Sequence, residues 1–414
     1  MASLKKVIAL ILLYLQLMAI NFSFLPLGVR SILGLMGLII TIERSEFRKF
    51  LSTRTLTGSF LFLCLWAIIS FASTIANQTN DYYFISFLIS QINTLFASIF
   101  LIYLFHFKFK YSSAQILDLV ITVISLFVLS GILLFIFPDI KDLLMSITVR
   151  SSAYEEEFMK DVQFRLIGFG PKFFGAGVFS GLGLILITYK LLTQKISKFV
   201  NLYYILLYII IFLGGVFASR TTIIGFFISI GMYVLKSKLF NLKNISFLII
   251  SVIVIFSLIN YLIDNSDRLG LSALTKFGFE FIYNYQITGS VSTGSTNQLI
   301  EMIKIPKSFY TYILGNGLFT DTKTGYFYKQ IDIGYLRMIY YSGIFSLLAM
   351  IVFFTKLIYS KILCNSLGYF FCNSIFIFFI IVYFKGVTGI NSFIFLILGT
   401  LFLENYKTKH NATL

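Results

Sequence analysis

The sequence predicts a helical membrane protein with about twelve transmembrane helices and two large loops on one side of the membrane. Hydrophobic residues make up 58% of the chain and charged residues only 12%, about half the charged fraction of a soluble domain. Apolar runs of about 20 residues recur along the chain, and a helix of that length crosses about 30 Å of hydrocarbon. A transmembrane barrel would show alternating segments of about 10 residues instead.

The first apolar run, Val7 to Ile20, follows Lys5 and Lys6 and is similar to the core of a signal peptide. No small-residue cleavage site follows it and another apolar run does, so we expect it to be retained as the first span. With boundaries uncertain by about 2–4 residues, the predicted spans are 7–22, 26–42, 57–75, 83–105, 116–137, 173–189, 201–218, 220–235, 245–263, 331–355, 366–384 and 387–403.

These spans divide the chain into five parts. Residues 1–137 form helices 1–5, and residues 138–172 form a first large periplasmic loop. Residues 173–263 form helices 6–9, and residues 264–330 form a second large periplasmic loop. Residues 331–414 form helices 10–12 and a cytoplasmic tail. The second loop is too rich in Phe and Tyr for a disordered linker. We therefore expect it to fold into short helices.

The charges predict the orientation of the spans. An even number of crossings places both termini on one side, and the loops on that side hold 18 basic and four acidic residues, a net charge of +14. The other side holds 15 basic and 13 acidic residues, a net charge of +2. Cytoplasmic loops carry the basic excess, so both termini are predicted to be cytoplasmic. The net charge of +16 therefore requires no nucleic-acid partner.

Motifs of soluble enzymes are missing from the sequence. It has no phosphate-binding or dinucleotide-binding glycine loop, no metalloprotease helix and no nucleophile elbow. The three cysteines, Cys64, Cys364 and Cys372, imply neither disulfides nor a metal site. His106 and His410 are the only histidines, and the predicted orientation places both in the cytoplasm. We expect no metal, no cofactor and no catalytic histidine on the outer face.

The candidate functional residues are basic side chains at the outer ends of helices: Arg30, Arg165, Arg220, Arg337 and Lys385. An arginine at membrane depth costs about 2.5–3.5 kcal/mol on insertion scales, so it usually has a partner or a function. Alternatives remain open, since Arg30 and Lys385 would also reach lipid headgroups and Arg165 would also pair with acids of its own loop. Arg220 lies in a hairpin too short for its side chain to extend freely.

Asp332 and Arg337 are five positions apart, about 140° of helix rotation, so we expect them not to form the usual i, i+4 pair. Each would then need another partner, which leaves room for a ligand. An alternative role for Asp332 is to cap the tenth helix.

Several short stretches resemble the O-antigen polymerase family. They are Ser308–Gly317, Asp332-Ile-Gly334 and Ser342-Gly343-Ile344, with Ser219-Arg220-Thr221 between two helices and Arg165 ahead of glycines. Their order and spacing carry the resemblance, which covers most of the chain. The arginine–glycine spacing of the family is matched loosely, by Arg165 with Gly175 or Gly177 and by Arg268 with Gly270 or Gly278. The related O-antigen ligases use an outer-loop histidine, which this chain lacks, so polymerase is favoured over ligase.

The resemblance implies a metal-independent glycosyltransferase of the bacterial inner membrane that joins oligosaccharide units carried on undecaprenyl diphosphate. Arg220, Arg165 and Arg337 are then expected to bind the departing diphosphate, with Arg30, Arg268 and Lys385 as further substrate-binding residues. Asp332 is the expected general base, ahead of Glu301 and Asp321. The expected partners are the lipid-linked oligosaccharide, membrane lipid and a chain-length regulator protein. A flippase or other transporter of lipid-linked oligosaccharides, and a purely structural membrane protein, are the alternatives from other classes.

Overall fold

The computed structural model describes residues 2–148, 165–171, 173–194, 197–236, 253, 256–268, 270–321, 325–387 and 389–411. Every regular element in these ranges is a helix, apart from two isolated β-bridges, Phe22 with Thr148 and Thr320 with Phe327. The helices fall into two compact units. One comprises Met1–Val123, Asp142–Tyr154 and Glu301–Leu414, and the other Ile124–Lys141 and Glu155–Ile300. The predicted all-helical class is confirmed.

Six helical segments in the described ranges are long and apolar enough to cross a membrane. They are α4 (Arg54–Ala76), α5 (Tyr83–Tyr103) with the π-helical turn η1 (Leu104–Lys108), α6 (Ser113–Ile136), α9 (Phe174–Thr193), α10 (Lys198–Ala218) and α17 (Gly334–Ile358). The pair α18 (Lys361–Leu367) and α19 (Tyr369–Lys385), bent by 117°, makes a seventh if it is counted as one span. These helices indicate a membrane-embedded protein.

Other predicted spans correspond to shorter or less apolar helices. Helix α1 (Ala2–Leu17) has 16 residues, and α2 (Val29–Glu43) and α11 (Thr222–Lys236) have 15 each. At 1.5 Å per residue, 15 residues extend about 22 Å, less than the hydrocarbon thickness. Helix α20 (Asn391–Asn411) corresponds to the last span. Residues 245–252 of the ninth predicted span lie outside the described residues, as do 149–164 and 172 of the first predicted loop. The count of twelve stays a prediction.

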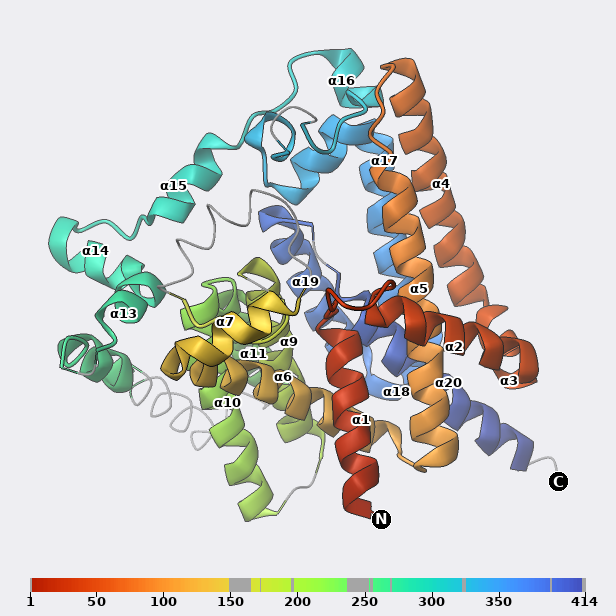
Figure 1. Cartoon of the computed structure of the whole chain (residues 1–414), viewed down its shortest axis with the longest axis horizontal. Coiled ribbons are helices and arrows are strands. Elements are labelled where there is room, and N and C mark those ends of the chain that lie inside the picture. The colour runs from red at the N-terminus through yellow and green to blue at the C-terminus, as the bar shows by residue number, and fades with distance from the viewer. Residues whose placement is uncertain are drawn as a thin grey trace. The chain divides into compact units, whose positions relative to one another are not determined.

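In the first unit, α4 and α5 lie beside α17 (Figure 1), and α2 and α20 pack against α5. Helix α2 is followed by the short α3 (Ser45–Leu51). The closest approach of α2 to α5 is at Gly37, where a Cβ atom would collide with the Phe96 carbonyl. Small residues allow such backbone contact between membrane helices. At the α18–α19 bend, the free thiols Cys364 and Cys372 lie with their Sγ atoms 3.0 Å apart.

Helix α17 is kinked at Ser342 and Gly343, and Gly343 has a φ of +81°. A kink releases carbonyls that need other donors. The Asn316 amide donates to the Tyr340 carbonyl at 2.6 Å, and the Gly317 amide donates to the Tyr341 carbonyl at 2.9 Å. Two of the stretches that carried the family resemblance, 308–317 and 342–344, are therefore in contact. Amides at the end of the first stretch donate to helix carbonyls that the kink in the second leaves without a helix partner.

In the second unit, α9 packs against α10 and α11. Only residues 219–221 separate α10 from α11, which confirms the short hairpin predicted around Arg220. Gly225 of α11 lies against the backbone of Gly181 in α9. Short helices follow, α13 (Ser272–Gly278), α14 (Glu280–Thr288) and α15 (Gly294–Glu301). The first unit also contains α16 (Phe309–Leu314) and the 3₁₀ turn η3 (Tyr328–Gln330), and α7 (Pro138–Ser146) begins in the second unit and ends in the first. The second predicted loop thus contains the short helices expected of it.

Candidate functional site

Arg220 is held in the hairpin between α10 and α11 and forms an ion pair with Glu280, at the start of α14. The Arg220 side chain is only 14% exposed and the Glu280 side chain 30%. The other oxygen of Glu280 accepts a hydrogen bond from the Gly294 amide at 2.8 Å. Glu280 is therefore fixed at both oxygens, and it fixes Arg220 in turn.

Arg165 lies beside Arg220 because both guanidinium groups pack on Phe277. The Arg165 Cζ atom is 4.3 Å from the centre of the Phe277 ring, and the Arg220 Cζ atom is 5.0 Å from it. Arg165 also lies 4.7 Å from the centre of the Phe173 ring. We call Arg165, Arg220, Phe277 and Glu280 the arginine clamp. It joins two arginines that the sequence placed in separate loops.

The hydroxyl groups beside Arg220 do not extend the clamp. Ser219 and Thr221 are buried, and the Ser219 hydroxyl donates to Thr221 Oγ1 at 3.2 Å. Both pack where Gly177 leaves space on α9. Thr222 is fully buried as well. These three side chains serve the packing of α9 against the hairpin.

In the first unit, Arg337 and Asp332 form an ion pair, with 3.3 Å between Arg337 Nη1 and Asp332 Oδ1. The expectation that each would need another partner was wrong. The physical reason is that α17 starts at Gly334, so Asp332 lies before the helix. The rotation of 100° per residue, which holds inside a helix, therefore does not apply between Asp332 and Arg337. Asp332 does not cap the helix either, because Ile333 occupies the capping position and no side chain there bonds to the helix amides.

Arg337 is buried between two aromatic rings. Its Cζ atom lies 4.0 Å from the centre of the Phe319 ring and 3.5 Å from the centre of the Phe327 ring. Tyr83 stacks on Phe319 at 3.5 Å between ring centres, with 7° between the planes. Asp81 fixes this segment by accepting from the amides of Phe319 and Thr320 at 2.7 and 2.9 Å. These contacts hold the guanidinium of Arg337 in one place.

Asp332 has the electrostatics of a general base. Desolvation by burial raises its pKa from 3.8 to about 6, although the charges of Arg337 and Lys385 act to lower the pKa. Half of the side chain is nevertheless exposed, so a hydroxyl group can reach it. Lys385 ends α19, and Gly334 lies against the adjoining Tyr383 and Gly386 because it has no side chain. The structure thus brings Asp332, Arg337 and Lys385 together.

The other candidates have different surroundings. Arg30, at the start of α2, donates through Nη2 to the Gln16 carbonyl at 2.8 Å and to Ser392 Oγ at 3.3 Å. Arg268 is exposed in a turn, and Glu301 is exposed at the end of α15. Asp321 is half-buried in the segment after Phe319. Nothing in their surroundings raises Arg268, Glu301 or Asp321 above the other candidates.

Sequence reasoning missed the aromatic and acidic residues that position the arginines. Phe277, Phe319 and Phe327 are three of 49 phenylalanines, and none carries a distinguishing pattern. Glu280 is a lone acidic residue in an aromatic segment, and Asp81 is a lone acidic residue in a polar one. The one available signal was the unusual aromatic content of residues 277–285.

A scan of the chain against models of known protein families finds no match, and neither does a search of curated proteins. The likeness to O-antigen polymerases therefore stays an expectation from the short stretches of sequence.

Proposed function

We propose that this chain is a polymerase of lipid-linked glycans, acting on repeat units carried on undecaprenyl diphosphate. In the reaction, a hydroxyl oxygen of the acceptor glycan forms a bond to the anomeric carbon of the donor. The bond from that carbon to the diphosphate oxygen breaks, and the electron pair leaves with the lipid diphosphate. The hydroxyl proton passes to a base. The arginine clamp is the observation that carries the proposal.

The clamp has the chemistry to bind a departing diphosphate. Guanidinium groups are always charged and present planar forks that match phosphate oxygens in pairs. Arg165 and Arg220 are already placed by Phe277, and Arg220 also by Glu280, so little rearrangement is needed when charge develops on the leaving group. One well-placed arginine contributes about 10³–10⁵ in rate in phosphoryl transfer. With two guanidinium groups and one carboxylate, the clamp keeps a net positive charge that favours an anion.

Asp332 is the proposed base. A general base works best when its pKa lies near the working pH, and such a base typically contributes about 10²–10⁴ in rate. The carboxyl group of Asp332, with a pKa of about 6, is ionised at neutral pH but still basic enough to take a proton. Arg337 and Lys385 then act as positioning residues that keep the carboxylate ionised.

A flippase for the same lipid-linked units is the alternative from another class. A transporter relies on ionisable residues along a cavity near the membrane midplane. In the described residues, the arginine clamp lies in a hairpin and at the starts of short helices, and Asp332 precedes α17. Positions at helix ends favour chemistry at a membrane surface, so we place polymerase first and flippase second. Ligase is third, because it would need a histidine on the outer face.

The experiment compares glycan ladders made by cells that carry Arg220 variants at equal protein level. Arg220→Ala should abolish polymer, and Arg220→Lys should restore it only partly, because a point charge cannot reproduce two parallel hydrogen bonds. Lys276→Ala is the matched control, since Lys276 is an exposed cation next to Phe277 and outside the clamp. Full-length polymer from Arg220→Ala would refute the role of the clamp.

A further inference from the structure

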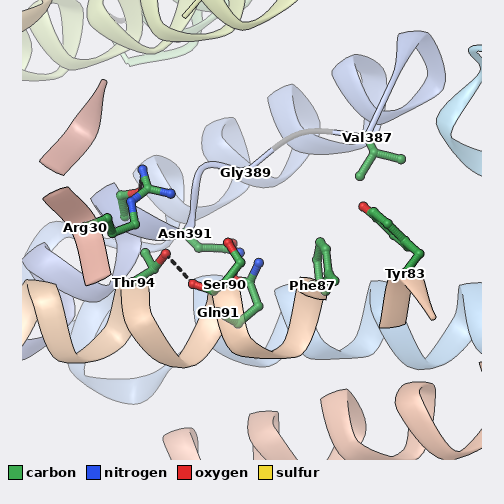
Figure 2. Close-up of a pocket in the computed structure, with 10 residues that line it drawn as sticks. Arg30, Tyr83, Phe87, Ser90, Gln91, Thr94, Val387, Gly389 and Asn391 are labelled. Atoms are coloured by element: carbon green, nitrogen blue, oxygen red, sulfur yellow. Dashed lines mark hydrogen bonds between the residues drawn. The ribbon is translucent and has the colours of Figure 1, made fainter. Parts of the chain in front are cut away.

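A cavity of about 210 Å³ lies in the first unit, and no residue of the arginine clamp lines it. Arg30 of α2, Gln91 and Thr94 of α5, and Asn391 of α20 gather toward one end of it, while Tyr83 and Val387 lie at the other end (Figure 2). Ser392 of α20 also lines the cavity. The lining mixes polar side chains with apolar ones such as Phe87 and Val387, and it contains a cation but no acidic residue. The polar end of the cavity is therefore suited to a negatively charged group.

The charge of Arg30 is only partly compensated by the protein. Its Nη2 atom donates to the Gln16 carbonyl, in the last turn of α1, and to Ser392 Oγ. The C-terminal end of a helix carries a partial charge of about −0.5, which neutralises only half of the charge of a guanidinium group. The Nε atom of Arg30 is buried and has no hydrogen-bond partner among the described residues. A buried N–H donor without an acceptor is costly, and an anion in the cavity would supply one.

The start of α20 also favours an anion in the cavity. Asn391 is the first residue of this 21-residue helix, so the free amides of the first turn and the positive end of the helix dipole lie at the cavity wall. The Asn391 side chain donates from Nδ2 to Gln91 Oε1. Its own Oδ1 is buried without a donor from the described residues. The wall thus offers both an unused donor with a positive charge and an unused acceptor.

We propose that this cavity binds an oxyanion that carries a neighbouring hydroxyl group, as in hydrogen phosphate or a sugar acid. The anionic oxygens would accept from Arg30 Nε and from the first turn of α20, and the hydroxyl would donate to Asn391 Oδ1. The site is independent of the polymerase proposal and would hold whatever the arginine clamp does. The competing explanation is that Arg30 only ties the end of α1 to the start of α20.

Trp66 provides a direct readout of binding. It is the only tryptophan in the chain, and its ring lies 5.0 Å from that of Phe87, which lines the cavity. The purified full chain, in a phosphate-free detergent solution of constant ionic strength, would be titrated with inorganic phosphate, with glucuronate and with uncharged glucose. We expect a saturable change in fluorescence with phosphate, glucuronate or both, and none with glucose.

Asn391→Asp tests the site with almost no change in shape. It places a negative charge in the cavity beside Arg30 and should weaken oxyanion binding at least tenfold, while an acidic residue in the first turn of α20 favours the helix. Gln91→Glu repeats the test on α5. The matched control is Asn93→Asp, because Asn93 lies on the same helix but bonds to Ser31 Oγ and does not line the cavity. Thermal unfolding of each variant confirms that it is folded.

The pattern of binding identifies the source of the ligand. Phosphate alone indicates a phosphate group, glucuronate alone indicates an acidic sugar, and binding of both indicates that the oxyanion itself is recognised. Glucose binding as tightly as glucuronate would overturn the role of charge. The proposal also fails if no anion binds saturably, or if Asn391→Asp and Gln91→Glu bind as the unmodified chain does.

Discussion

Polymer synthesis should fall on acidification, with its midpoint near pH 6, because Asp332 must be ionised to accept the proton of the acceptor hydroxyl. Burial raises the Asp332 pKa to about 6. At pH 5 about one-tenth of such a carboxyl group is ionised, and at pH 7.5 nearly all of it is. The initial rate at pH 5 should therefore be about one-tenth of the rate at pH 7.5.

Arg337 determines where that midpoint lies, since its Nη1 atom is 3.3 Å from Asp332 Oδ1. A neighbouring opposite charge depresses the pKa of a carboxyl group by about 1–3 units. Arg337→Met should move the midpoint upward by about one unit, whereas Arg337→Lys should leave it near pH 6. The assay is the initial rate of polymer formation by purified enzyme in lipid vesicles from pH 4.5 to 8.5. A flat profile, or the same midpoint in both variants, would refute the reasoning.

The raised pKa of Asp332 affects stability in the opposite direction: acidification lowers the rate but favours the folded state. The Asp332 pKa is raised above its ordinary value of 3.8, so the fold favours the protonated carboxyl group. This contribution to stability is complete below about pH 3.8 and is lost as the pH rises through about 6. Asp332→Asn keeps the neutral form, so it should unfold no more easily at pH 7 while its rate falls at least 10²-fold. A rate loss that accompanied unfolding would leave Asp332 a structural residue only.

Two further predictions concern the fold and the orientation of the chain. Gly315→Ala should lower stability strongly, because the Gly315 backbone, with a φ of +82° and a ψ of −176°, lies in a region that almost only glycine adopts, at a cost of about 1–3 kcal/mol for another residue. Its Cβ would also lie 2.5 Å from the Ser342 amide, and such a collision costs about 1–3 kcal/mol more. Gly289→Ala, at a left-handed glycine with open space around it, is the control and should cost only about 1–2 kcal/mol in thermal unfolding. The orientation is tested by cysteine labelling in a chain without Cys64, the one exposed cysteine. Asp321→Cys should react with an impermeant thiol reagent in intact cells, and Lys108→Cys should react only after permeabilisation. The reverse pattern would overturn the predicted topology.

Composition and local pattern were enough to predict the helical class and the tight hairpin at Arg220, because both depend on short-range properties of the chain. The lengths of α1 and α2 were not predictable, since the apolar runs continue past Leu17 and begin before Val29, where helix ends depend on packing. The bend of 117° between α18 and α19 was missed as well. Its cause is Gly368, with a φ of +87°, which reads in sequence as an ordinary glycine near the start of the predicted span 366–384.

For the site, the sequence predicted the charged residues but not their partners. Charged side chains are rare in an apolar chain and stand out, so Arg165, Arg220 and Arg337 could be selected one by one. Their aromatic partners could not, because 18% of the residues are aromatic and contacts between distant segments leave no periodic pattern. The pair of Asp332 and Arg337 was misjudged for a more specific reason: the helix begins at Gly334, three residues later than the predicted span, so Asp332 lies outside it.

Reconstitution tests the central claim that this chain polymerises lipid-linked glycan through a leaving diphosphate. The full chain in lipid vesicles would receive undecaprenyl-diphosphate-linked repeat units, and both glycan length and free undecaprenyl diphosphate would be measured. The account predicts one free lipid diphosphate for each new linkage, in the presence of a metal chelator, with both products lost in Arg220→Ala. Transfer of intact units across the membrane without new linkages would contradict it and identify a flippase instead.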